Sequence, residues 1–197
     1  MSFRKEKKFR LTISDFYKLQ TLLKSQGMRN LYEARMINSL YYDTKNLDMF
    51  HDSEEGVVPR KKLRIRWYNK NNLFSVEKKI SSIEGRYKST IPLKNSSTTK
   101  NFPKSFSDET YGILTPSLFI SYIRSYFEFN EIRITFDSNI TYEHMRMSNP
   151  IKVEDPERVM EIKVGANYND DLIDNLIPYT TSRFSKYSRG ILFTKHS

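Results

Sequence analysis

The chain has 197 residues, enough for one domain with a sizeable core, and carries a net charge of +10. It has no cysteine, which excludes disulfides and thiolate chemistry and fits a reducing compartment, so we expect a cytoplasmic location. No apolar run reaches the roughly 18 residues of a membrane span, and no glycine-rich phosphate loop is found. The residues after Met1 contain no secretory apolar stretch, so we do not expect a signal peptide. The positive charge predicts an anionic partner; the alternative is that the charge serves only to keep the protein soluble.

The period of side-chain polarity predicts the elements of the first half. In chain order they are a strand at Arg4–Leu11, a helix at about Ser14–Gln26, a strand at Met36–Asp43, a short helix around Leu47–Phe50, and strands at Arg60–Tyr68, Leu73–Ile80 and Arg86–Leu93. The helix has an apolar stripe and Gly27 as its stop signal, so we expect it to cover one side of a sheet.

The second half continues the same pattern. We expect a loop at Lys94–Lys104, a short helical piece at Phe106–Leu114, a hairpin of Leu118–Phe129 and Glu131–Ile140, a strand at Val159–Val164 and a short helix at Asp170–Ile177; no element is assigned to the closing segment Ser182–Gly190. Together these elements predict a single α+β domain over residues 1–197 that is mainly antiparallel β with flanking helices.

The segment Arg60–Tyr68 is dense in charge but reads as a strand. Alternate strand residues point to opposite faces, about 7 Å apart along each face. One face therefore carries Lys62, Arg64 and Arg66, and the other carries Leu63, Ile65 and Trp67. Like charges in such a row repel one another, so the row needs water, carboxylates or a bound polyanion.

Cations recur on one face of the other strands too. They are Arg4, Lys8, Lys79, Arg86, Lys88, Arg124, Arg133 and Lys163, and the carboxylates that share these faces are Glu6, Glu77, Glu131, Asp137 and Glu161. A carboxylate among cations can neutralise them or hold a metal ion. Such a sheet either keeps a flat, wet face or closes into a barrel whose lumen is charged. Periodicity leaves both alternatives open.

Six segments stand out together, in this order: Lys5–Phe9, Ser39–Asp43, Arg60–Tyr68, Val76–Lys79, Met160–Lys163 and Arg183–Tyr187. Their order and spacing resemble the VTC domain, the polyphosphate polymerase domain of the triphosphate tunnel metalloenzymes, or CYTH superfamily. The resemblance runs from about Arg4 to about Ile191. It implies a closed antiparallel β-barrel tunnel with flanking helices, in which ATP or another triphosphate, or polyphosphate, binds together with Mn²⁺ or Mg²⁺.

The resemblance also implies roles for individual residues. Phosphate binding falls to Lys8, Arg64, Arg66, Lys79, Lys88, Arg124, Arg133, Ser185 and Lys186, with Arg86 as the alternative to Lys88 and with Lys62 and Lys163 on the same faces. Tyr122 is expected beside the phosphate chain, and Glu161 is the expected metal ligand. Glu6 is a second candidate for the metal, and for hydrolysis it is the candidate that orients water. Arg4 departs from the superfamily, where a glutamate is common, which leaves fewer carboxylates for metal.

We expect a polymerase that transfers the γ-phosphate of ATP to a polyphosphate chain. The alternatives are an inorganic or nucleoside triphosphatase of the same fold and a non-catalytic polyphosphate-binding module. No nucleic acid partner is expected, because the aromatics of the strands point away from the cations. Relatives of this type also carry a regulatory domain and a membrane anchor, which are not expected here, so a membrane partner protein is a further alternative.

Overall fold

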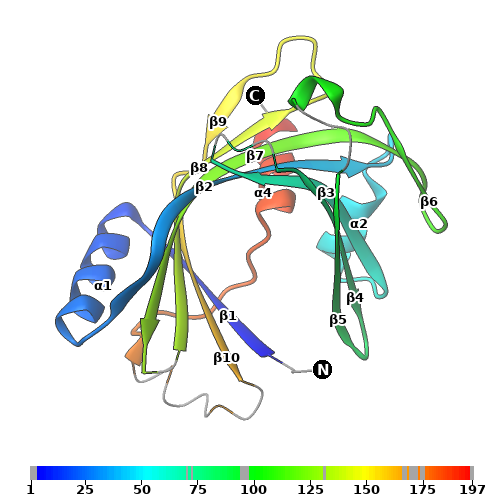
Figure 1. Cartoon of the computed structure of the whole chain (residues 1–197). Coiled ribbons are helices and arrows are strands. Elements are labelled where there is room, and N and C mark those ends of the chain that lie inside the picture. The colour runs from blue at the N-terminus through cyan, green and yellow to red at the C-terminus, as the bar shows by residue number, and fades with distance from the viewer. Residues whose placement is uncertain are drawn as a thin grey trace. The chain divides into compact units, whose positions relative to one another are not determined.

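The computed structural model describes residues 4–69, 71, 73–93, 98–130, 132–165, 168, 173 and 176–195 (Figure 1). The chain divides into two compact units. Unit 1 contains residues up to Arg35, Tyr122–Ile140 and Asp155–Phe184, and unit 2 contains Met36–Ser121, Thr141–Glu154 and the residues from Ser185 on. The expectation of one domain over residues 1–197 stays a prediction.

Ten strands and three helices form the regular structure of the described residues. The strands are β1 (Arg4–Leu11), β2 (Arg29–Asp43), β3 (Arg60–Tyr68), β4 (Ser75–Ser82), β5 (Gly85–Pro92), β6 (Phe106–Asp108), β7 (Gly112–Phe129), β8 (Ile132–His144), β9 (Lys152–Glu154) and β10 (Arg158–Gly165). The helices are α1 (Ile13–Ser25), α2 (Asp48–Glu55) and α4 (Lys186–Lys195), with a 3₁₀ turn at Thr99–Asn101. Hydrogen bonds link the strands in the order β1-β10-β8-β7-β2-β3-β4-β5, with β6 on β7 and β9 on β8.

The mainly antiparallel sheet with helices is confirmed. Every strand pair with a described register runs antiparallel. Among the described residues, no helix has both the length and the apolar character needed to cross a membrane. Closure into a tunnel stays a prediction.

In unit 1 the apolar face of the strands packs on α1, as predicted. Thr12 caps this helix by accepting a hydrogen bond from the backbone N–H of Asp15, and Phe16, Leu19 and Leu23 turn inward. They meet apolar side chains from β1, β7, β8 and β10, including Phe9 and Phe136. The charged side chains of these strands therefore lie on the face away from α1.

In unit 2 the apolar face of β3 packs into a second core. Leu63 and Ile65 are buried there with Leu40, Phe74 and Leu114, and Trp67 packs against the same cluster. Because side chains alternate, this packing turns Lys62, Arg64 and Arg66 to the opposite face, as the sequence predicts.

Several predicted bounds were wrong. The predicted helical piece at Phe106–Leu114 is instead β6, a turn and the start of β7. Asp108 ends β6 and accepts hydrogen bonds from the backbone N–H groups of Thr110 and Tyr111, and Gly112 takes a positive φ of 74°, which together make a tight hairpin turn. Strands β2 and β7 begin earlier than expected.

The closing segment contains a helix that the sequence did not predict. Ser185 stands just before α4, and its hydroxyl accepts a hydrogen bond from the backbone N–H of Ser188 at 3.3 Å. Gly190 lies against Leu118 and Tyr142, so that helix and strand approach closely. The predicted helix at 170–177 falls largely outside the described residues, as do Glu131 and the side chain of Arg4.

Candidate functional site

The charged face of unit 2 is built by register. In β2, β3 and β4, Tyr41, Arg64 and Glu77 stand opposite one another, and Ser39, Arg66 and Ser75 form the next row. A third row brings together Lys62, Lys79 and Lys88 from β3, β4 and β5. The sequence predicted these cations on one face, and the structure brings them together across strands.

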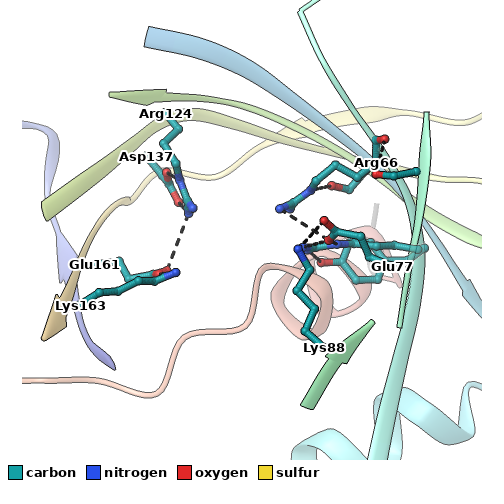
Figure 2. Close-up of polar contacts among 11 residues, drawn as sticks. Arg66, Glu77, Lys88, Arg124, Asp137, Glu161 and Lys163 are labelled. Atoms are coloured by element: carbon teal, nitrogen blue, oxygen red, sulfur yellow. Dashed lines mark hydrogen bonds and ion pairs between the residues drawn. The ribbon is translucent and has the colours of Figure 1, made fainter. Parts of the chain in front are cut away.

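Glu77 is the counter-charge of this face (Figure 2). Its Oε2 accepts hydrogen bonds from Arg64 Nε at 2.8 Å and Nη2 at 2.6 Å, and its Oε1 accepts one from Lys88 Nζ at 2.6 Å. Arg66 Nη1 lies 3.9 Å from the same carboxylate. Burial alone would raise the pKa of Glu77, but Arg64, Arg66 and Lys88 outweigh it and lower the pKa to about 2. We call Arg64, Arg66, Glu77 and Lys88 the Glu77 cluster.

A stacked tyrosine pair supports this cluster. Tyr41 accepts a hydrogen bond from Arg64 Nη1 at 2.7 Å, and its ring stacks on Tyr187 of α4 with centroids 4.8 Å apart. Tyr187 donates to the buried carboxylate of Asp43 at 2.6 Å. Burial opposes ionisation of Tyr41, yet the charges of Arg64, Arg66 and Lys62 lower its pKa. The pair thus connects α4 to Arg64.

The remaining unit 2 candidates lie around the cluster. Lys62 Nζ donates to Ser185 Oγ at 2.8 Å, which brings the start of α4 to the cationic face. Lys186 is the first residue of α4 and is half-buried. Arg86 is exposed on β5, two residues before Lys88. Both alternatives at this strand, Arg86 and Lys88, share one face, and Lys88 is the one that contacts Glu77.

The charged face of unit 1 centres on Glu161 (Figure 2). Glu161 Oε1 lies 2.8 Å from Lys163 Nζ, and its Oε2 lies 3.7 Å from Arg124 Nη2. Burial would raise the pKa of Glu161, but Arg124, Lys163 and Lys8 hold it well below its usual range. Arg124 itself is held by Asp137 through two hydrogen bonds, at 2.6 and 2.7 Å. We call Arg124, Asp137, Glu161 and Lys163 the Glu161 cluster.

The other unit 1 candidates flank this cluster. Lys8 is paired across the strands with Glu161, and its Nζ lies 3.2 Å from Glu6 Oε1. Arg133 stands opposite Lys163. The ring of Tyr122 lies 5.4 Å from the guanidinium of Arg124, so this tyrosine belongs to the charged face, and the expectation that the aromatics of the strands point away from the cations is wrong for it. Its place beside a phosphate chain stays a prediction.

The sequence missed several contributors. Glu77 and Asp137 were counted among the carboxylates of the charged faces, but not as the groups that hold Arg64 and Arg124. Tyr41 and Ser39 were not singled out, because they lie in a strand with many apolar residues. Their spacing of two residues along β2 was the sequence signal that they share one face. Ser39 Oγ accepts from Arg66 Nε at 3.1 Å.

A divalent cation fits the Glu161 cluster. Among the described residues no group of three His, Asp or Glu side chains could hold a metal ion by itself. However, Thr135 stands opposite Glu161, and its buried hydroxyl has no hydrogen-bond partner within the described part of the chain. Mg²⁺ and Mn²⁺ accept one or two carboxylates when water and phosphate oxygens complete the shell. Glu161, Thr135 and Glu6 are the residues that would hold such an ion.

Comparisons with known proteins concern the family and the fold of the chain. A family model described as the VTC domain matches residues 3–195. No curated protein matched the sequence. Among solved structures, a proposed adenylate cyclase from Bacillus halodurans is 14% identical with a TM-score of 0.59, over 93% of this chain and 94% of that one. A proposed adenylyl cyclase from Hippeastrum with a dominant triphosphatase activity is 15% identical, with a TM-score of 0.57 over 98% and 97%. These likenesses show the fold.

Proposed function

This chain belongs to the VTC domain family, and we propose that it is a metal-dependent polyphosphate polymerase that transfers the γ-phosphate of ATP to a polyphosphate chain. The closed tunnel that the resemblance implies and a cytoplasmic location are part of the proposal. In phosphoryl transfer the protein mainly has to hold the attacking and leaving oxygens in line and to place cations around the phosphate oxygens. The cations of the Glu77 cluster in unit 2 and, separately, those of the Glu161 cluster in unit 1 are the charges that support this proposal.

One observation carries the preference for transfer over hydrolysis. The buried carboxylates of the charged faces are committed to cations: Glu77 to Arg64 and Lys88, and Glu161 to Lys163. Their lowered pKa values make Glu77 and Glu161 poor general bases. A terminal phosphate that is already ionised needs no base, whereas attack by water is helped by one. The face therefore suits a phosphate acceptor.

Each set of residues has a distinct task in this proposal. Arg64, Arg66 and Arg124 bind phosphate oxygens through planar guanidinium forks, and Lys62, Lys79 and Lys88 act as point charges. Glu77 and Asp137 keep two of the arginines oriented before substrate arrives. A bound divalent ion would neutralise charge on the transferring phosphate.

A triphosphatase is the second candidate. The Hippeastrum protein shares the fold and has that activity. Glu6 is only half-buried, so among the acidic candidates it is the one best placed to orient water. The test is incubation with ATP and Mn²⁺, with and without a short polyphosphate primer, followed by separation of products by size. Long chains plus ADP support the polymerase, ADP and orthophosphate without long chains support the triphosphatase, and unchanged ATP supports a binding module.

Neighbouring lysines of β4 provide a matched control. Lys79 stands between Lys62 and Lys88 on the charged face, whereas Lys78 points to the other face and pairs with Asp108 at 2.7 Å. Asp108 also contacts Lys61, so Lys78→Ala leaves it a partner. Lys79→Ala should weaken ATP turnover, and Lys78→Ala should not. Equal losses would contradict the assignment of the charged face.

A further inference from the structure

Two tyrosines and two arginines gather on the charged side of unit 1. Tyr32 and Arg35 come from β2, Tyr126 from β7 and Arg133 from β8, and β7 is hydrogen-bonded between the other two strands. The two tyrosine rings meet edge to face, with centroids 5.9 Å apart. We call these four residues the tyrosine–arginine cluster. None of them makes up part of the Glu77 or Glu161 cluster.

The cluster concentrates positive charge. The guanidinium of Arg35 lies 5.8 Å from the centroids of both rings, and that of Arg133 lies 5.7 Å from the centroid of Tyr126. Both arginines are exposed, and the structure records no ion pair with a carboxylate for either within its described residues. Two guanidinium groups on one ring repel each other, and an anion between them would offset that repulsion.

The cluster also presents an open aromatic surface. Tyr126 is buried beneath the arginines, but Tyr32 is 52% exposed. Tyrosine rings and guanidinium planes are the groups on which proteins stack nucleobases, and such stacking tolerates any base because every base has a π-face. An anion site with a neighbouring aromatic platform fits a ligand that joins phosphate to a flat ring, which describes a nucleotide.

The position along the sheet gives the orientation of that ligand. Arg133 stands opposite Lys163, whose Nζ contacts Glu161 at 2.8 Å. Tyr126 follows Arg124 by two residues and therefore shares its face of β7. The tyrosine–arginine cluster is thus the neighbour of the Glu161 cluster on the same face of unit 1.

We propose that the tyrosine–arginine cluster binds the nucleoside end of a nucleoside triphosphate, with the base stacked on Tyr32 and with Arg35 and Arg133 beside the phosphate nearest the ribose. This inference rests on the proposed function, because it takes the Glu161 cluster as the site of the outer phosphates. It names the substrate more narrowly: the protein distinguishes a nucleoside triphosphate from inorganic tripolyphosphate through this cluster.

The test compares two ligands on four proteins. Calorimetry measures binding of ATP and of tripolyphosphate, both with Mg²⁺ and at one ionic strength, to the unaltered chain and to the variants Tyr32→Ala, Tyr32→Phe and Tyr17→Ala. Tyr32→Ala should weaken ATP binding about tenfold, a typical effect of losing one stacked base. Its affinity for tripolyphosphate should stay unchanged. Tyr32→Phe keeps the ring and should bind ATP like the unaltered chain.

Tyr17 serves as the control, because it is an exposed tyrosine of unit 1 on α1 and lies outside the cluster. Circular dichroism checks that each variant is folded. If tripolyphosphate binds and Tyr32→Ala leaves ATP binding unchanged, or if Tyr17→Ala weakens it as much, the inference is wrong while the proposed function stands. If the unaltered chain binds neither ligand, the proposed function fails and the inference fails with it.

Discussion

Replacing Glu77 by glutamine tests the electrostatics of the unit 2 face. The substitution keeps the shape of the side chain but removes the negative charge that faces Arg64, Arg66 and Lys88. A pKa lowered from 4.5 to about 2 means that the folded state favours the ionised form of Glu77. The lowering corresponds to about 3 kcal/mol of folding free energy at neutral pH. Glu77→Gln should therefore lower Tm by about 6 to 12 °C.

The pH dependence of this effect has a defined sign. Because the folded-state pKa of Glu77 is depressed, its contribution is fully present above about pH 4.5 and is lost as the pH falls through about 2. Urea unfolding followed by circular dichroism, at pH values from 7 to 3, should show the unaltered chain losing about 2 kcal/mol of its advantage over Glu77→Gln by pH 3. Glu84→Gln, an exposed carboxylate in the turn after β4, is the control and should change little.

Two results would refute this reasoning. Equal stability of Glu77→Gln and the unaltered chain at pH 7 would mean that the buried carboxylate does not hold the cations. A deficit that stays constant from pH 7 to pH 3 would mean that the glutamine disturbs packing, and not charge.

Three further predictions concern the charged faces and α4. Saturating tripolyphosphate, at about 100 times its dissociation constant, should stabilise the chain by about 2.7 kcal/mol, measured as a rise in Tm; an unchanged Tm would count against an anion site. Tyr187→Phe removes the donor to the buried Asp43 and should cost about 1 to 3 kcal/mol in urea unfolding, whereas an unaltered midpoint would show that water replaces the hydroxyl. Gly190→Ala should cost about 1 to 3 kcal/mol, because the added Cβ would lie 2.5 Å from Leu118 and 2.6 Å from Tyr142; no loss would mean that these side chains give way.

Alternation along a strand is a local property, and for that reason the sequence predicted the charged faces well. Lys62, Arg64 and Arg66 share one face of their strand whatever the rest of the chain does, because side chains alternate along a strand. Leu63 and Ile65 on the opposite face are buried in the core, which turns the three cations away from it. Which cation meets which carboxylate is not local. The pairing of Arg64 with Glu77 follows from the register of β3 and β4, which depends on the turn between them.

The helix α4 shows the other limit of local reasoning. Its sequence contains Gly190 and several residues of modest helix propensity, so the pattern alone argues against a helix. The structure stabilises it through Ser185 at its start and through packing that Gly190 permits against Leu118 and Tyr142. Leu118 and Tyr142 lie more than forty residues before Gly190 in the chain, so a helix-propensity argument does not include them.

The placement of Trp67 has a consequence for experiments. It is the chain's one tryptophan, and it packs in the core of unit 2 against Phe74, Phe102 and Phe119. Its fluorescence therefore reports the melting of unit 2, whereas circular dichroism reports both units. Coincident transitions by the two probes would show that the units unfold as one cooperative block, and separate transitions would give each unit its own stability. The single tryptophan thus gives unit 2 a fluorescent probe of its own, and unit 1 has none.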